Sequence, residues 1–231
     1  MDERIIDIIK DAEMVLVGIG EEFSPAVPAY TGDASLETFY KSKYYAEISQ
    51  EDETIQAYNH LRRLIGAKPY FVVTMNTDDL IYRSEFEKDL IVAPCGSMGK
   101  MQCREHIVDA KAICDAVLEK EDASLAVCPQ CGEPLHFHTI NEEGYLEEGY
   151  LGQWEKYKKW LTCTLNRKLV ILELGVGFQF PQVVRWPFEK TAFYNQKSTL
   201  VRVNSKFPQL TAELSQRGVS IPESPVELFV K

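Results

Sequence analysis

The chain has 231 residues, of which 45% are hydrophobic and 26% charged, and this ordinary globular composition argues against the disordered and fibrous classes. Its formal net charge is −10. Because nucleic acids and anionic membrane surfaces attract clustered Lys and Arg, we expect neither a nucleic acid nor a membrane among the partners.

The N-terminal residues 1–20 carry charges within their apolar stretch and have no small-residue cleavage site, unlike a signal peptide. No run of the sequence approaches the roughly 18 to 20 apolar residues of a membrane-spanning helix. We therefore expect a cytoplasmic protein. Its six cysteines are then expected to bind metal or to be buried, rather than to form disulfides.

Five short runs rich in Val, Ile and Leu predict buried strands, because each run is continuous rather than alternating between apolar and polar residues. Residues 34–48 and 52–65 repeat apolar side chains at three- and four-residue spacing, which predicts helices between the strands. The last run, 226–231, is expected to form an edge strand. The five buried runs are 14–20, 70–76, 90–96, 168–177 and 198–204.

Strands that alternate with helices indicate the α/β class, with a Rossmann-like parallel sheet covered on both faces. Residues 100–162 break this pattern, since they contain no convincing buried strand but many cysteines and histidines. We expect them to form a small zinc-binding module that ends in a helix at 153–161. The sheet domain would then be discontinuous, made of residues 1–99 and 163–231.

Two short motifs predict the metal site of this module. Cys128 and Cys131 are separated by two residues and followed by a glycine, and Cys103 and His106 have the same spacing. The two pairs enclose a loop of 21 residues, which is typical of a closed, structural Cys3His zinc site. His136 and His138 remain open as alternatives for the fourth ligand, and so does an incidental origin of both pairs.

The order of several further motifs resembles the sirtuins, whose pattern is TQNID, then HG, then two zinc pairs. Here Thr74-Met-Asn76-Thr-Asp78 ends the second strand, and Cys95-Gly96 ends the third, eight residues before the first zinc cysteine. Gly175-Val-Gly177 and Val203-Asn204 resemble the later glycine turn and Val-Asn pair of the family. The stretch 172–189 resembles bacterial sirtuin-like proteins related to the macrodomain-linked class M, whose members perform ADP-ribosyl transfer.

This resemblance, which spans about residues 14 to 204, implies an enzyme that consumes NAD bound at the carboxyl ends of the strands. It implies that Asn76 and Asp78 hold the nicotinamide end and the ribose, and that Asn204 binds the adenosine ribose. Seen without the resemblance, Asn76 and Asp78 are also common turn-forming residues after a strand. The cofactor-binding residues expected on this basis are Gly18, Gly20, Asn76, Asp78, Gly175, Gly177, Val203 and Asn204.

The sequence also departs from the sirtuin pattern. Cys95 stands where deacetylating members carry a catalytic histidine, and a thiol with an ordinary pKa near 8.5 is a poor general base at neutral pH. Cys95 is expected to be either a small buried residue or part of the site, with nucleophilic catalysis the least favoured reading. Met75 replaces a glutamine, the family's acyl-lysine groove motif is missing, and no arginine matches the one after the first strand. Glu21 and Glu22 stand in that turn, where they complement a helix dipole or repel a diphosphate.

The leading hypothesis is a sirtuin-like protein ADP-ribosyltransferase or NAD-cleaving enzyme that breaks the bond between nicotinamide and ribose. Its expected site residues are Asn76, Asp78 and Cys95, its partners are NAD or ADP-ribose and an unidentified protein acceptor, and its zinc is structural. A degenerate sirtuin fold that senses nucleotides or binds proteins is the alternative. An NAD-dependent protein deacylase is the third.

Overall fold

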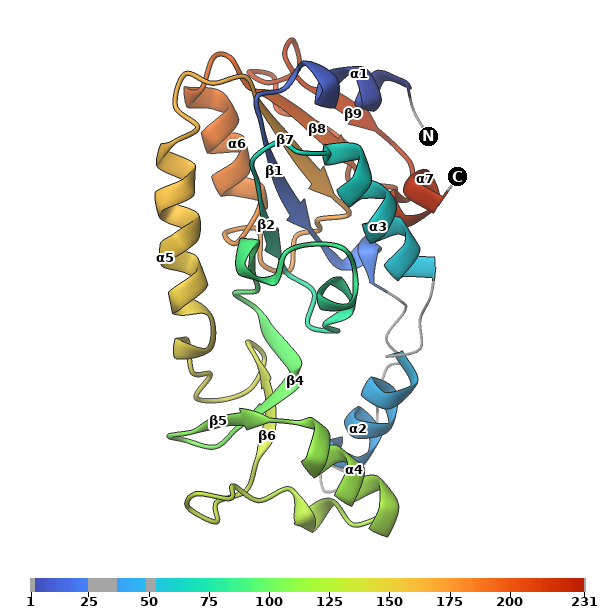
Figure 1. The fold of residues 1–231 in the computed structure, drawn as a ribbon, viewed down its shortest axis with the longest axis vertical. Coiled ribbons are helices and arrows are strands. Elements are labelled where there is room, and N and C mark those ends of the chain that lie inside the picture. The colour runs from blue at the N-terminus through green and yellow to red at the C-terminus, as the bar shows by residue number, and fades with distance from the viewer. Residues whose placement is uncertain (1–2, 25–36, 49–52, 231) are drawn as a thin grey trace.

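The computed structural model describes residues 3–24, 37–48 and 53–230, and Figure 1 shows its arrangement. A parallel sheet of six strands has the order β3-β2-β1-β7-β8-β9. All five predicted buried runs contribute strands to this sheet, which confirms the α/β class. The strands are β1 (Met14–Ile19), β2 (Tyr70–Thr74), β3 (Ile91–Val92), β7 (Leu169–Leu174), β8 (Thr199–Val203) and β9 (Val219–Ile221).

Helices cover both faces of this sheet, which explains why its strands are mostly apolar. On one face, Val15 and Val17 of β1 belong to a core with buried residues of α1 (Glu3–Asp11), α3 (Glu53–Ile65) and α7 (Pro225–Val230). On the other face, Leu16 of β1 packs in a core with α5 (Glu148–Thr162) and α6 (Arg185–Tyr194). In Figure 1 these two groups of helices lie on opposite sides of the sheet.

A second, smaller unit extends from the strand ends of the parallel sheet (Figure 1). Three antiparallel strands with the order β5-β4-β6 pack with two helices around a core that contains Met101, Val117 and Phe137. We call this unit the small lobe. It consists of α2 (Glu37–Ile48), β4 (Gly96–Gln102), β5 (Ile107–Asp109), α4 (Lys111–Lys120), η5 (Ala123–Leu125) and β6 (His136–Thr139).

Residues 100–162, where no convincing buried strand was expected, contain β5, β6 and the end of β4. β5 and β6 are short, and β4 is built largely from Gly, Ser, Met and Lys, so their sequences lack the Val-rich and Ile-rich signal of a buried strand. The helix expected at 153–161 is the second half of α5. The domain limits at residues 100 and 162 stay a prediction.

The expected edge strand at 226–231 is also wrong, because residues 225–230 form α7. Pro225 stands at the first helical position, where its fixed φ favours a helix, and Leu228 and Phe229 are buried. The edge of the sheet is β9 instead, which pairs in parallel with β8 through Val201, Arg202 and Val203.

The helices expected at 34–48 and 52–65 are confirmed as α2 and α3 within the described residues. Residues 34–36, Asp52, and the segment 25–36 that follows the first strand's turn lie outside that part of the chain. Short 3-10 helices occur at η1 (Glu21–Phe23), η3 (Leu80–Arg83) and η4 (Lys88–Leu90). Within the described residues, no helix combines the length and the apolar character needed to cross a membrane.

Candidate functional site

A cavity of about 900 Å³ lies between the end of β2 and the small lobe. Met75, Asn76, Thr77 and Asp78 line it from the parallel sheet, and Cys95 lies in the same wall. Because ligands of open α/β sheets bind outside the carboxyl ends of the strands, this is the expected place for a binding site. From the opposite side the cavity is lined by Tyr40, Tyr44, Met98, Phe137, Thr139, Ile140 and Asn141.

Asp78 is held rigidly in this wall. Its Oδ1 accepts a hydrogen bond from the Leu80 amide at 2.9 Å, and its Oδ2 accepts one from the Ser24 hydroxyl at 2.5 Å. Burial raises the pKa of Asp78, and these two donors oppose the rise. Asn76 is only half-buried, and its Nδ2 lies at 3.5 Å from the Tyr58 hydroxyl. Its carboxamide is therefore positioned to meet a ligand in the cavity.

Cys95 is 2% exposed, and burial raises the pKa of its thiol to about 12. A thiol that stays protonated at neutral pH serves neither as a general base nor as a nucleophile. The glycine that follows has a packing role, because Gly96 has φ +99° and a Cβ there would lie 2.1 Å from the His138 carbonyl oxygen. This glycine lets the start of β4 run close against β6.

The glycine turn (residues 175–177) follows β7 and packs against the turn that follows β1. Gly175 has φ +66°, and a Cβ there would lie 2.6 Å from Cβ of Glu22. A Cβ at Gly20 would lie 2.4 Å from Cα of Val176, and one at Gly18 would meet Val184 at the same distance. The structure thus places these glycines at close contacts within the protein. Their contacts with a cofactor stay a prediction.

Asn204 is 1% exposed and makes hydrogen bonds within the protein. Its Nδ2 donates to the Val176 carbonyl at 3.0 Å, and its Oδ1 accepts from the amides of Lys206 and Phe207 at 3.0 and 2.6 Å. It therefore connects the glycine turn to the loop after β8. Val203, the preceding residue, is fully buried at the end of β8.

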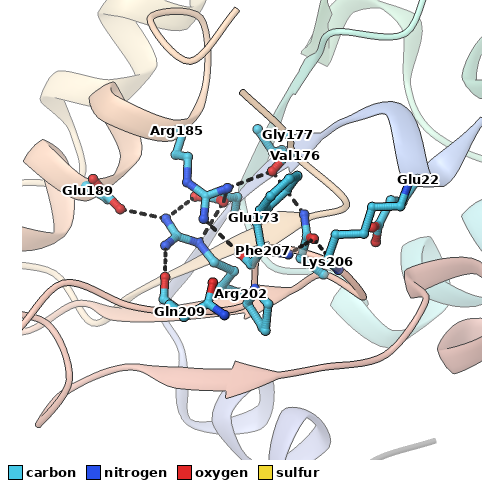
Figure 2. A network of polar contacts seen from close by, with 12 residues as sticks. Glu22, Glu173, Val176, Gly177, Arg185, Glu189, Arg202, Lys206, Phe207 and Gln209 are labelled. Atoms are coloured by element: carbon cyan, nitrogen blue, oxygen red, sulfur yellow. Dashed lines mark hydrogen bonds and ion pairs between the residues drawn. The ribbon is translucent and has the colours of Figure 1, made fainter. Parts of the chain in front are cut away.

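A buried group of charges lies beneath these two loops and was not predicted (Figure 2). Arg202 donates from Nε and Nη2 to the two carboxylate oxygens of Glu173 at 2.7 and 2.8 Å, and from Nη2 to Glu189 at 2.7 Å. Arg185 lies 3.8 Å from Glu173 and donates to the carbonyls of Val176 and Phe207, each at 2.8 Å. The sequence carried a signal for this group: Glu173 and Arg202 are the charged residues inside two strands that are otherwise apolar.

Glu21 and Glu22 accept hydrogen bonds from these loops on the side that faces away from the buried charges. The Glu21 carboxylate accepts from the Gly177 amide at 3.1 Å and also lines the cavity. The Glu22 carboxylate accepts from the amide and the hydroxyl of Ser205 at 2.8 and 2.7 Å. Both side chains thus act as acceptors toward the glycine turn and the loop after β8.

Two further residues escaped the sequence prediction: Asp79, next to the cavity residue Asp78, and Tyr44, in the opposite wall. Asp79 has φ +62°, and its Oδ2 accepts from the Ser97 hydroxyl at 2.7 Å and from the Gly99 amide at 2.8 Å. Tyr44 lines the cavity from α2, and its buried hydroxyl has no hydrogen-bond partner within the described residues. Apolar spacing predicts the helix that carries Tyr44 but not the surface on which that helix packs.

The predicted metal ligands come together in the small lobe. The ligand atoms of Cys103, His106, Cys128 and Cys131 all lie within 4.8 Å of one another. The Cys103–Cys131 sulfur distance is 3.7 Å, and Nδ1 of His106 lies 3.5 and 3.8 Å from the sulfurs of Cys103 and Cys128. Zinc–sulfur bonds of about 2.3 Å in a tetrahedron place two sulfurs about 3.8 Å apart, so this arrangement is compatible with zinc.

The two alternative histidines lie outside this cluster. His138 shares a hydrogen bond of 2.8 Å between its Nε2 and the Leu146 carbonyl, and its ring packs on Tyr145. The His136 Nε2 is buried and has no hydrogen-bond partner within the described residues. His106 is therefore the histidine whose geometry fits the cluster.

No family model matches the chain. A solved structure of a mutant Sir2 homologue in complex with ADP-ribose superimposes with a TM-score of 0.64, at 14% identity, over 100% of this chain and 94% of that one. The chain has the sirtuin fold. A Sir2 protein bound to a myristoylated histone peptide gives a TM-score of 0.62 over 98% of this sirtuin-like chain and 92% of its own, also at 14% identity.

Two curated relatives are similar in sequence to this sirtuin-like protein. One is a protein ADP-ribosyltransferase of Staphylococcus aureus, 23% identical over 256 residues that cover 93% of this chain and 81% of the relative. The other, from Fusarium oxysporum, is named a probable bifunctional ADP-ribose hydrolase/ADP-ribosyltransferase and is 30% identical over 135 residues. That match covers 52% of this chain and 23% of the relative's length.

Proposed function

We propose that this sirtuin-like protein cleaves NAD between nicotinamide and ribose and transfers the ADP-ribose to an unidentified protein or to water. The observation that carries the proposal is the cavity that brings Asn76, Asp78 and Cys95 together at the end of β2. The relative named a protein ADP-ribosyltransferase, which matches along most of the chain, supports the transfer reaction. The proposal includes a cytoplasmic location.

NAD, when bound, supplies the bond that breaks, and positive charge develops on its ribose as nicotinamide leaves. The half-buried carboxamide of Asn76 would hold the nicotinamide end through hydrogen bonds. Asp78 would accept a hydrogen bond from the same end, and its carboxylate is held in place by Ser24 and the Leu80 amide. A carboxylate fixed beside a developing positive charge stabilises that charge without having to reorganise.

The same cavity disfavours deacylation. Deacylation requires a base to remove a proton from a ribose hydroxyl, and a positioned base contributes about 10²- to 10⁴-fold to a rate. Cys95 does not provide this base, because burial raises the pKa of its thiol to about 12. Loss of nicotinamide does not depend on such a base, so NAD cleavage is compatible with Cys95.

The proposed zinc is structural. Cys103, His106, Cys128 and Cys131 would supply all four ligands of a tetrahedral ion, which leaves no open position for chemistry. The ion would connect the β4–β5 turn to the loop before β6. In this way it would stabilise the small lobe that forms one wall of the cavity.

A second function is favoured by one specific observation. The Glu21 carboxylate already accepts a hydrogen bond from the Gly177 amide. Backbone amides of this kind bind phosphate in nucleotide sites. A protein whose turn is occupied in this way would bind nucleotides weakly. It would then act as a nucleotide sensor or a protein-binding module rather than as an enzyme.

Nicotinamide release by single-residue variants tests the proposal. Asn76→Ala is expected to slow release at least about tenfold, which corresponds to the loss of one hydrogen bond in the transition state. Asn59→Ala is the control, since Asn59 accepts from the Glu85 amide outside the cavity. Equal rates for Asn76→Ala and the unaltered protein would refute the role of the β2 end. ADP-ribose binding without any NAD turnover would favour the sensor.

A further inference from the structure

The peptide unit between Val176 and Gly177 is held in place by two buried side chains. Its carbonyl oxygen accepts hydrogen bonds from the Arg185 guanidinium at 2.8 Å, which Figure 2 shows, and from the Asn204 side-chain amide at 3.0 Å. Arg185 and Asn204 are 4% and 1% exposed, so neither donor is free to move. Two buried donors on one carbonyl fix the orientation of the whole peptide plane.

The orientation of the carbonyl determines the orientation of the N–H. In a trans peptide the two groups point in opposite directions, and none of the described peptide bonds is cis. The Gly177 N–H therefore points away from the buried charges, toward the outer side of the turn. There it meets the Glu21 carboxylate at 3.1 Å.

Glu21 occupies the space that a ligand of this N–H would need. Its Oε1 lies 1.7 Å from the position of a Cβ added at Gly177, so the absent side chain leaves the room that the carboxylate fills. Glu21 itself is exposed and lines the large cavity. An exposed carboxylate is only weakly held by one hydrogen bond, because water competes for both partners.

From this geometry we infer that Glu21 is a displaceable internal anion that sets the affinity of the site for diphosphate-containing ligands. The inference rests on the proposed function, in which NAD or ADP-ribose binds across these strand ends. A diphosphate that approaches the Gly177 N–H must displace the Glu21 carboxylate and is also repelled by its charge. A ligand without the diphosphate, such as adenosine, meets neither obstacle.

Glu21 thus acts as a specificity-determining residue. It weakens the binding of ADP-ribose and NAD relative to uncharged nucleosides, and removing it should reverse this preference. Glu22 provides the matched control. It is the adjacent acidic residue of the same turn, but its carboxylate binds Ser205 instead of the glycine turn.

Calorimetric titration of the whole protein with ADP-ribose and with adenosine tests this inference. Glu21→Ala is expected to bind ADP-ribose about tenfold more tightly than the unaltered protein, the effect of one charged hydrogen bond. Its affinity for adenosine should change less than about twofold, because adenosine has no diphosphate that competes with Glu21. Glu22→Ala should not tighten ADP-ribose binding. Equal or weaker ADP-ribose binding by Glu21→Ala would overturn the inference.

The same titrations separate this inference from the proposed function. If Glu21→Ala tightens ADP-ribose binding but neither protein releases nicotinamide from NAD, the inference stands and the enzymatic proposal fails. If ADP-ribose binds to the unaltered protein and to Glu21→Ala with equal affinity while nicotinamide is released, the proposal stands and the inference fails. If ADP-ribose binds to neither protein, both are overturned.

Discussion

At position 95 a buried thiol lies in the wall of the cavity where the resemblance to deacetylating sirtuins places a histidine. The two residues differ in size and in the proton each holds at neutral pH, because burial raises the pKa of Cys95 to about 12. One substitution therefore removes the general base and leaves the cavity beside it in place. In the proposed function, the chemistry that remains is the breaking of the nicotinamide bond.

The rate of alkylation by iodoacetamide at pH 8 reports whether the Cys95 thiol is buried and protonated, because only an accessible thiolate reacts. In the folded protein, Cys95 should react at least about a hundredfold more slowly than Cys163, which is exposed. In denaturant the two residues should react at similar rates. Peptide mass spectrometry reports both rates, and labelling of Cys95 as fast as Cys163 in the native protein would contradict the protonated, buried thiol.

Asp79 gives a prediction for the dependence of stability on pH. Burial raises its pKa to about 6, and hydrogen bonds from Ser97 and Gly99 oppose the rise. The folded state therefore holds this proton more tightly than the unfolded chain, whose Asp pKa is near 3.9. The stability that this proton contributes is fully present below about pH 4 and is lost as the pH rises through 6.

Asp79→Asn removes this dependence and keeps an acceptor oxygen, and Asn tolerates the left-handed backbone found here. Between pH 5 and pH 7.5 the variant should gain about 1 kcal/mol of unfolding free energy relative to the unaltered protein. Asp115→Asn, which removes an exposed acid paired with Lys111, should show no such gain. Parallel urea curves at the two pH values check this, and a pH-independent difference for Asp79→Asn would refute the raised pKa.

At the scale of elements, the sequence predicts the strands of the parallel sheet well and the small lobe poorly. Five runs are mostly apolar because each strand is covered on both faces, so their signal is strong. β5 and β6 are short and only partly covered, and β4 is rich in Gly, Ser, Met and Lys, so none of the three has such a signal. The run at 226–231 is apolar because α7 buries Leu228 and Phe229, so composition alone does not separate a short buried helix from a strand.

The pairing of β7 with β8 places Glu173 opposite Arg202, and both side chains are buried. Arg202→Met should lower the unfolding free energy by about 3–5 kcal/mol, because the Glu173 carboxylate then stays buried without its main partner. Arg167→Met is the control: its ion pair with Glu13 is exposed, so the cost should stay below about 1 kcal/mol.

The double variant Glu173→Leu, Arg202→Met should recover part of the loss, because no uncompensated charge remains. Urea unfolding followed by circular dichroism measures all four proteins. Equal losses for Arg202→Met and Arg167→Met would show that the buried pair is no more important than the exposed one.

The metal cluster gives a prediction for the small lobe. Cys128→Ser should lose the bound zinc, because it removes one of four ligands. His136→Ala should keep close to one zinc per chain, since His136 lies outside the cluster. Elemental analysis of protein purified without added metal distinguishes the two variants. A folded, metal-free unaltered protein, or loss of zinc from His136→Ala, would contradict the assignment.

At the scale of the whole molecule, the cavity is made by segments that are far apart in the sequence. Asn76, Asp78 and Cys95 were predicted as site residues from the resemblance to the sirtuin motif order, and the carboxyl ends of parallel strands do share one edge of a sheet. The opposite wall was not predicted. Tyr40 and Tyr44 come from α2, which precedes the second strand in sequence yet packs on the small lobe. Helical periodicity identifies a buried face but does not say which surface covers it.

The central claim is that this cavity cleaves NAD without deacylating lysine, and one experiment tests it most directly. The unaltered protein is incubated with NAD and an acetyl-lysine peptide, and mass spectrometry follows nicotinamide, ADP-ribosylated protein and the peptide in parallel. We expect nicotinamide release that depends on Asn76, with ADP-ribose appearing on protein or in solution and the peptide still acetylated. Robust deacetylation of the peptide, or no turnover of NAD, would contradict the account.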